Sequence, residues 1–402
     1  MKQSQPRRSL GDLVLPERIA AMHAAPALGP ALLFFSGGTA LRPLCRKLKR
    51  YTHRSIHLIT PFDSGGSSAE IRRVFDFLSV GDLRNRLLAL ADESGENNGG
   101  LYHLLSYRLP KGRPRAELSE ELSSLAAGEH RLTKAVSPAL LGPITSTLQF
   151  VASILPPTFE LEGANVGNLL LTGIFLSHDR DINSALLIVS KMLGVLGTVA
   201  PSSEANAQLA ARLDDGTLVV GQHRLTGKQE ASIESPIREL FLTASLDSQE
   251  PIEVPASPLA LQYIAEADLI CYPYGSFYSS VLCNLLPRGI SNAIVSARCP
   301  KAYVPNWGCD PEQLGMTLAD TVERLVQSVR REAPEARMRD IVQRVLIDSA
   351  HLDYTLHLDL SRVEQLGIEV IDVPFAEHPS FAKGRGAEAD FTGLVELLAS
   401  LS

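Results

Sequence analysis

Short apolar runs, glycine-rich turns and amphipathic helices follow one another in the first part of the chain. Residues 31–35 read Ala-Leu-Leu-Phe-Phe, a continuous apolar run typical of a strand buried on both faces, and apolar side chains then recur at helical spacing over 41–48. A second strand is predicted over 56–59, followed by a helix whose apolar side spans 71–78. This order predicts parallel strands joined by helices.

Polar residues mark where two of these helices begin. Ser67 and Glu70 have the spacing of a capping box, and Asp82 is suited to the N-cap of the next helix, which continues through 87–91. These signals predict helix starts at Ser67 and Asp82.

A stretch of different composition interrupts the pattern. Residues 96–160 are richer in turns and charges and include a polar helix predicted over 116–127, so we expect an inserted helical segment there. Two apolar helices follow, and Asp214-Asp215-Gly216 between runs at 207–213 and 217–220 predicts a small antiparallel hairpin.

The α/β pattern then resumes. Strands are predicted over 268–272, 302–306 and 367–371, and a helix is predicted over 277–286. The elements together predict an α/β fold with a mostly parallel sheet and a small antiparallel excursion.

Composition limits the class of protein. The 402 residues are 45% hydrophobic, enough for a large core, and 38 basic against 45 acidic residues give a net charge of −7. Without a general basic surface, neither nucleic acid nor an anionic membrane is an expected partner. The five cysteines form no Cys-x-x-Cys pair, no apolar run reaches the roughly 18 residues of a membrane span, and no signal peptide is recognisable, so we expect a cytoplasmic protein.

Glycines follow three of the predicted strands, at 36–39, 63–66 and 273–276. Glycine lets backbone N–H groups approach a phosphate, and the start of the following helix favours negative charge. Each turn alone is also compatible with a plain strand-to-helix connection, whereas together they favour one anion-binding crevice at the carboxyl ends of adjacent strands. The first two turns contain neither a P-loop nor a full Gly-x-Gly-x-x-Gly, which argues against an ATPase and a simple NAD dehydrogenase.

Six motifs occur in the order found in the CofD-like family, which this chain resembles from residue 32 to about 310 and more loosely to 373. They are Ser-Gly-Gly-Thr at 36–39, Asp-Ser-Gly-Gly-Ser-Ser at 63–68, Gly-Asp-Leu-Arg-Asn at 81–85, Gly-Asn at 167–168, Gly-Ser at 275–276 with Asn284-Leu285-Leu286, and Asn306. The family contains 2-phospho-L-lactate transferase and the YvcK-type gluconeogenesis factors, which bind nucleotide sugars. The second and third motifs are more similar to the YvcK type.

The resemblance implies a Rossmann-like three-layer fold with the inserted helical segment at about 96–160. It divides the chain into an N-terminal arm (1–30), a CofD-like α/β domain (31–375) and a C-terminal arm (376–402), and it is compatible with a homodimer.

The resemblance also implies a site. In the transferase, a Mg²⁺-dependent reaction moves a phospholactyl group from a guanosine diphosphate-linked donor to a hydroxyl of a deazaflavin. Carried onto this chain, Asp63 becomes the catalytic carboxylate and a magnesium ligand, and the ligand is a nucleotide diphosphate-linked small molecule or a nucleotide sugar. The residues expected to bind nucleotide and phosphates are Gly37, Gly38, Thr39, Gly65, Gly66, Ser67, Arg84, Asn85, Asn168, Gly275, Ser276 and Asn306. From composition alone, Arg84 and Asn85 also fit the solvated side of a helix.

Three departures from the family pattern leave the activity open. Asp63-Ser64 stands where the family has two adjacent acidic residues, Ala40 stands where glycine is usual, and 273–276 reads Pro-Tyr-Gly-Ser instead of Gly-Pro-Gly-Ser. A transferase and a non-catalytic nucleotide-sugar-binding regulator therefore both remain. An NAD-dependent oxidoreductase is a third interpretation, because Asp63 lies 25 residues after Gly38, but no hydride-transfer partner is identifiable.

A second group of polar residues lies near the C-terminus. His351 and His357, with Asp353 and Asp359, are compatible with a metal site, although alternating polar residues on a half-exposed strand explain them more simply. Trp307 follows Asn306 and is expected near the crevice.

Overall fold

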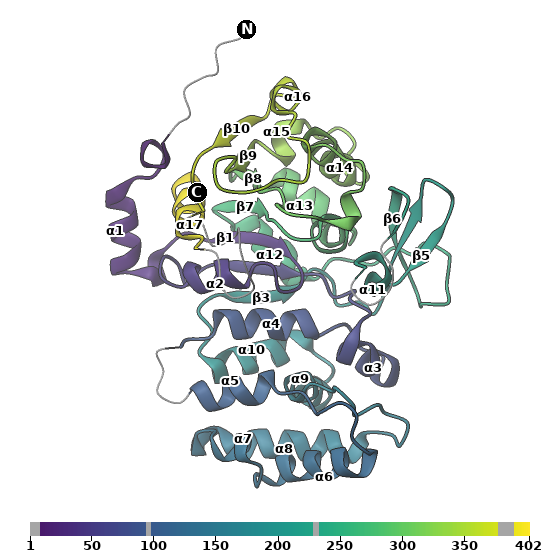
Figure 1. The fold of residues 1–402 in the computed structure, drawn as a ribbon. Coiled ribbons are helices and arrows are strands. Elements are labelled where there is room, and N and C mark those ends of the chain that lie inside the picture. The colour runs from purple at the N-terminus through teal and green to yellow at the C-terminus, as the bar shows by residue number, and fades with distance from the viewer. Residues whose placement is uncertain (1–8, 94–97, 228–232, 377–389) are drawn as a thin grey trace.

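Seven parallel strands form the central sheet of the computed structural model, which describes residues 9–93, 98–227, 233–376 and 390–402 (Figure 1). The spatial order is β10-β9-β8-β7-β1-β2-β3. The strands are β1 (Leu32–Ser36), β2 (Ile56–Ile59), β3 (Thr198–Pro201), β7 (Leu269–Tyr272), β8 (Lys301–Tyr303), β9 (Arg344–Ile347) and β10 (Glu369–Asp372). The predicted α/β fold with a mostly parallel sheet is confirmed.

Helices cover both faces of this sheet, because successive strand residues point to opposite sides. In β1, Leu32 and Phe34 belong to one core, and Leu33 and Phe35 belong to the other. The helices on the first side include α1 (Pro16–Ala24), α2 (Arg42–Leu48), α3 (Gly66–Phe75), α4 (Gly81–Leu90) and α17 (Thr392–Leu401). The helices on the second side are α12 (Pro258–Glu266), α13 (Ile290–Ser296), α14 (Leu318–Arg330), α15 (Met338–Ile341) and α16 (Leu360–Gln365).

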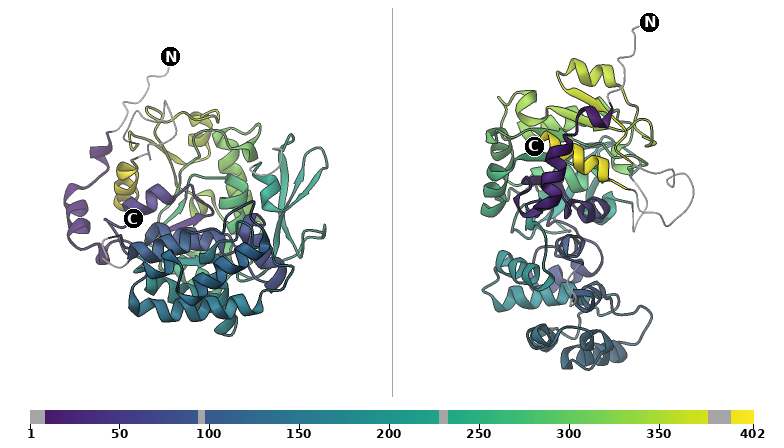
Figure 2. Two further views of the ribbon diagram at one scale, coloured as in Figure 1. Left: turned by 60° about the horizontal axis from the view of Figure 1, so that its bottom comes forward. Right: turned by 90° about the vertical axis from the view of Figure 1, so that its left-hand side faces the viewer.

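A stack of further helices extends the first side away from the sheet, as both views in Figure 2 show. It consists of α5 (Asn98–Ser106), α6 (Arg115–Ala127), α7 (Arg131–Lys134), α8 (Pro138–Ile154), α9 (Val166–Ser177) and α10 (Ile182–Leu193). The polar helix predicted over 116–127 is α6, and the predicted inserted segment is helical. No helix in the described part of the chain is both long and apolar enough to cross a membrane.

The antiparallel excursion is a three-stranded sheet in the order β5-β4-β6. Its strands are β4 (Gln208–Leu213), β5 (Leu218–Val220) and β6 (Ile237–Thr243). The hairpin predicted around Asp214-Asp215-Gly216 is confirmed, and β5 continues directly into the short helix α11 (Gln222–Leu225).

The α-helices nearest the two ends of the chain, α1 and α17, pack on the sheet domain. We predicted residues 376–402 to be a surface arm, which is wrong for 390–402: Leu394 and Leu398 of α17 are fully buried, and Asp390 forms an ion pair of 2.9 Å with Lys47 of α2. The apolar side of α17 has to be covered, and α1 and α2 cover it. Arg18 of α1 donates to the Ser402 carbonyl at 2.9 Å, and the two terminal helices lie side by side (Figures 1 and 2). Residues 1–8 and 377–389 lie outside the described residues.

Candidate functional site

A cleft opens at the carboxyl ends of β1, β2 and β7, where the three glycine turns meet. A cavity of about 220 Å³ lies next to a smaller one of about 120 Å³, and both are lined by Gly38, Ser276 and Ser280. The larger cavity is lined by Gly38, Asp63, Gly65, Gly66, Ser67, Ser68, Gly81, Asp82, Arg84, Asn85, Arg108, Asn168, Gln222, His223, Thr226, Ser276 and Ser280. The smaller one is lined by residues 35–41, 274–276, 280 and 281. We refer to the two together as the cleft.

The cleft brings together most of the residues predicted from the sequence. Gly37, Thr39 and Gly275 line its smaller part, and Asp63, Gly65, Gly66, Ser67, Arg84, Asn85 and Asn168 line its larger part. Asn306 is not among the described residues that line the cleft. Asn306 follows β8, which lies beyond β7 as seen from β1, and Trp307 packs against Tyr274 at 4.2 Å between ring centroids.

In the first glycine turn, residues 36–39, a backbone N–H group donates to a carboxylate. A Cβ atom at Gly37 would lie 2.7 Å from Ser280 Oγ, so any larger residue in this turn requires the serine side chain to shift. The Gly38 N–H donates to Asp82 Oδ2 at 2.7 Å. The prediction that Asp82 is an N-cap is wrong, because α4 already begins at Gly81 and the Asp82 side chain reaches across to the turn.

The second turn leads into an uncapped helix. Gly65 is the N-cap of α3 and has no side chain with which to cap the helix start. The predicted capping box is wrong: Ser67 Oγ accepts from the backbone N–H of Asn165 at 3.0 Å, and Glu70 pairs with Arg73. Since the first N–H groups of a helix have no partner within the helix, the start of α3 offers backbone donors to the cleft.

Arg84 places a buried positive charge at the cleft. Its side chain is 4% exposed, and one nitrogen, Nη2, donates to Asn85 Oδ1 at 2.6 Å. Nε and Nη1 have no hydrogen-bond partner among the described residues. Desolvation and the neighbouring charge of Arg108 lower the pKa of Arg84 to about 10. A guanidinium in this state favours an anionic ligand.

Asn168 supplies an acceptor beside this cation. Its Nδ2 donates to Ser67 Oγ at 3.3 Å, while its Oδ1 is buried and has no partner within the part of the chain that the structure describes. The preceding Gly167 is required for the close packing, since a Cβ there would lie 2.8 Å from Arg84 Cδ.

The third turn differs from the second in its donors. Gly275 has a φ of +132°, and the predicted helix 277–286 is a π-helical turn (Phe277–Val281) followed by a 3-10 turn (Leu282–Leu285). The N–H of Phe277 donates to Asp310 Oδ2 at 2.9 Å, and those of Tyr278 and Ser279 donate to Glu312 Oε2 at 2.9 and 2.8 Å. Desolvation, together with the charge of Asp310, raises the pKa of the buried Glu312 to about 7.

Residues in and directly after the short helix α11 also line the cleft. Gln222, His223 and Thr226 line the larger cavity, and Ser64 Oγ lies 2.7 Å from His223 Nδ1. Sequence reasoning missed these residues and Asp82. Histidine and glutamine directly after a predicted hairpin were the available signal, but only the tertiary structure brings the hairpin to the cleft.

The cleft fits a magnesium ion held partly by ligand phosphates. Asp63 and Asp82 both line it, and Mg²⁺ commonly binds one or two carboxylates together with phosphate oxygens. Asp63 Oδ1 accepts the Gly65 N–H at 3.0 Å, which fixes that carboxylate at the turn. Within the described ranges, no group of three or more His, Cys, Asp or Glu residues is arranged to hold a metal by itself.

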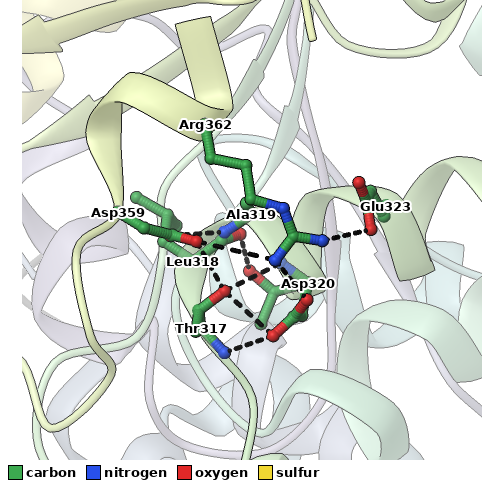
Figure 3. Close-up of polar contacts among 8 residues, drawn as sticks. Thr317, Leu318, Ala319, Asp320, Glu323, Asp359 and Arg362 are labelled. Atoms are coloured by element: carbon green, nitrogen blue, oxygen red, sulfur yellow. Dashed lines mark hydrogen bonds and ion pairs between the residues drawn. The ribbon is translucent and has the colours of Figure 1, made fainter. Parts of the chain in front are cut away.

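Asp359, one of the polar residues near the C-terminus, has a structural role (Figure 3). His351 lies in a turn and His357 in an isolated β-bridge with Thr317, so the prediction of a half-exposed strand carrying both histidines is wrong. Asp359 accepts from the Ala319 N–H at 2.9 Å and from Thr317 Oγ1 at 2.8 Å, and Arg362 donates to Asp320 and Glu323 at 2.8 Å each. These contacts fasten the segment to the start of α14.

Comparison with known proteins is consistent with this architecture. The family model described as 2-phospho-L-lactate transferase CofD matches residues 32–376. A putative gluconeogenesis factor of Nostoc sp. is 29% identical over 356 residues, covering 85% of this chain, and one of Clostridium acetobutylicum is 28% identical over 326 residues, covering 80%. This chain spans 63% and 57% of the length of these two relatives.

Two further proteins align over most of their length. The gluconeogenesis factor of Bacillus subtilis is 27% identical over 354 residues, which cover 85% of this chain and 90% of that protein. A crystal structure of a UPF0052 family member from Bacillus halodurans superimposes with a TM-score of 0.66 at 24% identity, covering 92% of this chain and 98% of that one. It shares the fold.

Proposed function

The chain belongs to the CofD family, and we propose that its cleft binds a nucleotide diphosphate-linked small molecule, such as a nucleotide sugar, through the diphosphate. The observation that carries this proposal is the buried Arg84 guanidinium, two of whose nitrogens lack partners among the described residues, beside the uncapped start of α3. A phosphate group satisfies both kinds of donor at once. The gluconeogenesis factors among the relatives suggest a role in carbohydrate metabolism, for which a nucleotide sugar is a suitable ligand.

Calorimetric titration tests binding directly. Wild-type protein is titrated with uridine and guanosine diphosphates and with their sugar esters, with and without Mg²⁺, and we expect saturable binding of at least one series. Native mass spectrometry of freshly purified protein would identify a retained nucleotide. If no nucleoside diphosphate or sugar ester binds under either condition, the proposed function is wrong.

Mg²⁺-dependent transfer of a phospho-acyl group of the 2-phospholactyl type to a hydroxyl acceptor is the second candidate. It is favoured by one observation: Asp63 and Asp82 line the same cleft, although Ser64 replaces the second acidic residue of the family motif. Magnesium held there by the two carboxylates and the ligand phosphates would neutralise the diphosphate charge. Asp63 would accept the proton of the attacking hydroxyl while the nucleoside monophosphate leaves.

The Asp63→Asn variant separates the two candidates. For a transferase, we expect turnover to be abolished while nucleotide affinity changes only about twofold to fivefold, because the amide keeps the size of the side chain but accepts no proton. Consumption of the donor is followed by phosphorus NMR. If wild-type protein binds the ligand with Mg²⁺ and consumes none of it in the presence of candidate hydroxyl acceptors, the transferase candidate fails and the binding function remains.

A further inference from the structure

The short helix α11 connects the small antiparallel sheet to the cleft. It follows β5 directly, and Gln222, His223 and Thr226 line the larger cavity from this side. None of the six motifs that relate the chain to its family lies between residues 169 and 274. The wall formed by α11 is therefore a part of the cleft to which those motifs assign no role.

Gln222 presents an unused hydrogen-bond acceptor. The side chain is 7% exposed, and its Nε2 donates to the Ser279 carbonyl at 3.1 Å, which fixes the orientation of the amide. Its Oε1 is buried and has no partner among the described residues. A buried acceptor without a partner is costly, and a phosphate oxygen cannot supply the missing hydrogen. A ligand group that satisfies Gln222 must therefore donate, as a hydroxyl does.

His223 is held in a defined orientation next to it. Ser64 Oγ lies 2.7 Å from Nδ1 and accepts the backbone N–H of His223 at 3.4 Å. Gly221, with a φ of +106°, supports the ring from the other side, since a Cβ there would lie 2.8 Å from His223 Cε1. The imidazole ring is thus held between Ser64 on one side and the backbone of Gly221 on the other.

We propose that α11 determines which ligand the cleft accepts by recognising a hydroxyl-bearing group of that ligand. This inference rests on the proposed function. Gln222 Oε1 accepts from a hydroxyl beside the imidazole of His223. This acceptor distinguishes polyol groups from ionised phosphates, because a hydroxyl donates a hydrogen bond and an ionised phosphate oxygen does not. The hydroxyls belong to the group esterified to the diphosphate or to the ribose, and the phosphates bind elsewhere, at Arg84 and α3.

The test compares three ligands of decreasing size on one variant. Gln222→Met keeps the length of the side chain and removes both amide functions, and Gln262→Met, whose exposed amide donates to Glu266 on α12, is the matched control. Wild-type and variant proteins are titrated calorimetrically with a nucleotide sugar, the nucleoside diphosphate and inorganic pyrophosphate. We expect Gln222→Met to weaken binding of at least one hydroxyl-bearing ligand about tenfold and to change pyrophosphate binding by less than about twofold.

The pattern of losses decides the inference. A loss confined to the nucleotide sugar places the recognised hydroxyl on the esterified group, a loss for both nucleotides places it on the ribose, and either outcome supports the proposal. Equal weakening of all three ligands, or no change in any of them, overturns it. If wild-type protein binds none of the three ligands, the proposed function itself is wrong and this inference falls with it.

His223→Phe provides a second test if Gln222→Met lowers the melting temperature. It removes both ring nitrogens and keeps a planar ring against Gly221. We expect the same selective loss for hydroxyl-bearing ligands, and a uniform loss that includes pyrophosphate contradicts the proposal.

Discussion

Two glycine turns at the same edge of the sheet differ in how their backbone donors are satisfied. At the start of α3, the N-cap residue Gly65 has no side chain to cap the helix, and the buried Arg84 lies at the same cleft. At the π-helical turn Phe277–Val281, three backbone N–H groups already donate to Asp310 and Glu312. The start of α3 therefore offers backbone donors to a ligand in the cleft, whereas the chain itself supplies the acceptors at the π-helical turn.

The contrast shows that a glycine turn after a strand is not by itself a phosphate site. Both turns follow parallel strands and precede a helical segment, and they differ in whether a carboxylate from a distant part of the sequence reaches the donors. Glu312 comes from the loop after β8 and is 1% exposed. The following predictions test this contrast.

Removing the Arg84 guanidinium at the cleft should have the largest effect on ligand binding. We expect Arg84→Met to weaken binding of a nucleoside diphosphate about a hundredfold, because the proposed function makes the guanidinium the buried partner of the phosphate. The melting temperature should stay equal or rise, since an unpaired buried charge is replaced by an apolar chain. Arg73→Met, which removes an exposed partner of Glu70, is the control and should bind normally. Equal affinities of the Arg84 variant and wild type would contradict the account.

Removing the Glu312 acceptor of the π-helical turn should affect stability instead. Glu312→Ala leaves the N–H groups of Tyr278 and Ser279 without their acceptor, and we expect the free energy of unfolding to fall by about 2 kcal/mol. Urea denaturation measures this loss. Glu312→Gln, which keeps an acceptor oxygen, should lose less, and an unaffected alanine variant would show that the carboxylate is not needed.

A smaller effect on binding is expected at the first glycine turn. In Gly37→Ala the new Cβ would lie 2.7 Å from Ser280 Oγ, so the Ser280 side chain has to move at the edge of the cleft. We expect about a tenfold loss of nucleotide affinity. The double variant Gly37→Ala with Ser280→Gly relieves this contact and should recover most of the affinity, whereas no recovery would place the cause elsewhere.

The raised pKa of Glu312 also predicts a pH dependence of stability. Since burial raises the pKa of Glu312 from 4.5 to about 7, the folded state keeps this proton where the unfolded state has released it. The stabilisation is complete below about pH 4.5 and is lost as the pH rises through about 7. Urea denaturation across this range should show the decline in wild type and a flatter profile in Glu312→Gln. Parallel profiles would show that another group is responsible.

The sequence predicted those parts of the molecule that local patterns determine. The apolar runs at β1 and β2, the polar helix α6 and the Asp-Asp-Gly hairpin were all recognisable, and parallel strands bring their following turns to one edge. The residues lining the cleft were largely predicted for this reason, although their binding roles stay predictions.

Contacts between distant segments could not be predicted in the same way. Asp82 has the local pattern of an N-cap, but its carboxylate meets Gly38, 44 residues away, and Ser64 meets His223, 159 residues away. Similarly, α17 follows a polar stretch that predicts a surface arm, yet its leucines complete the core beside α2. Such pairings depend on how the layers pack and leave no local trace in the sequence.

Backbone amide NMR of deuterated protein tests the contrast between the two turns most directly. Saturating amounts of a nucleotide sugar that binds should shift the amide signals of Gly66, Ser67 and Ser68 at the start of α3 and leave those of Phe277, Tyr278 and Ser279 nearly unchanged. Large shifts at the π-helical turn with none at α3, while calorimetry shows binding, would contradict the account.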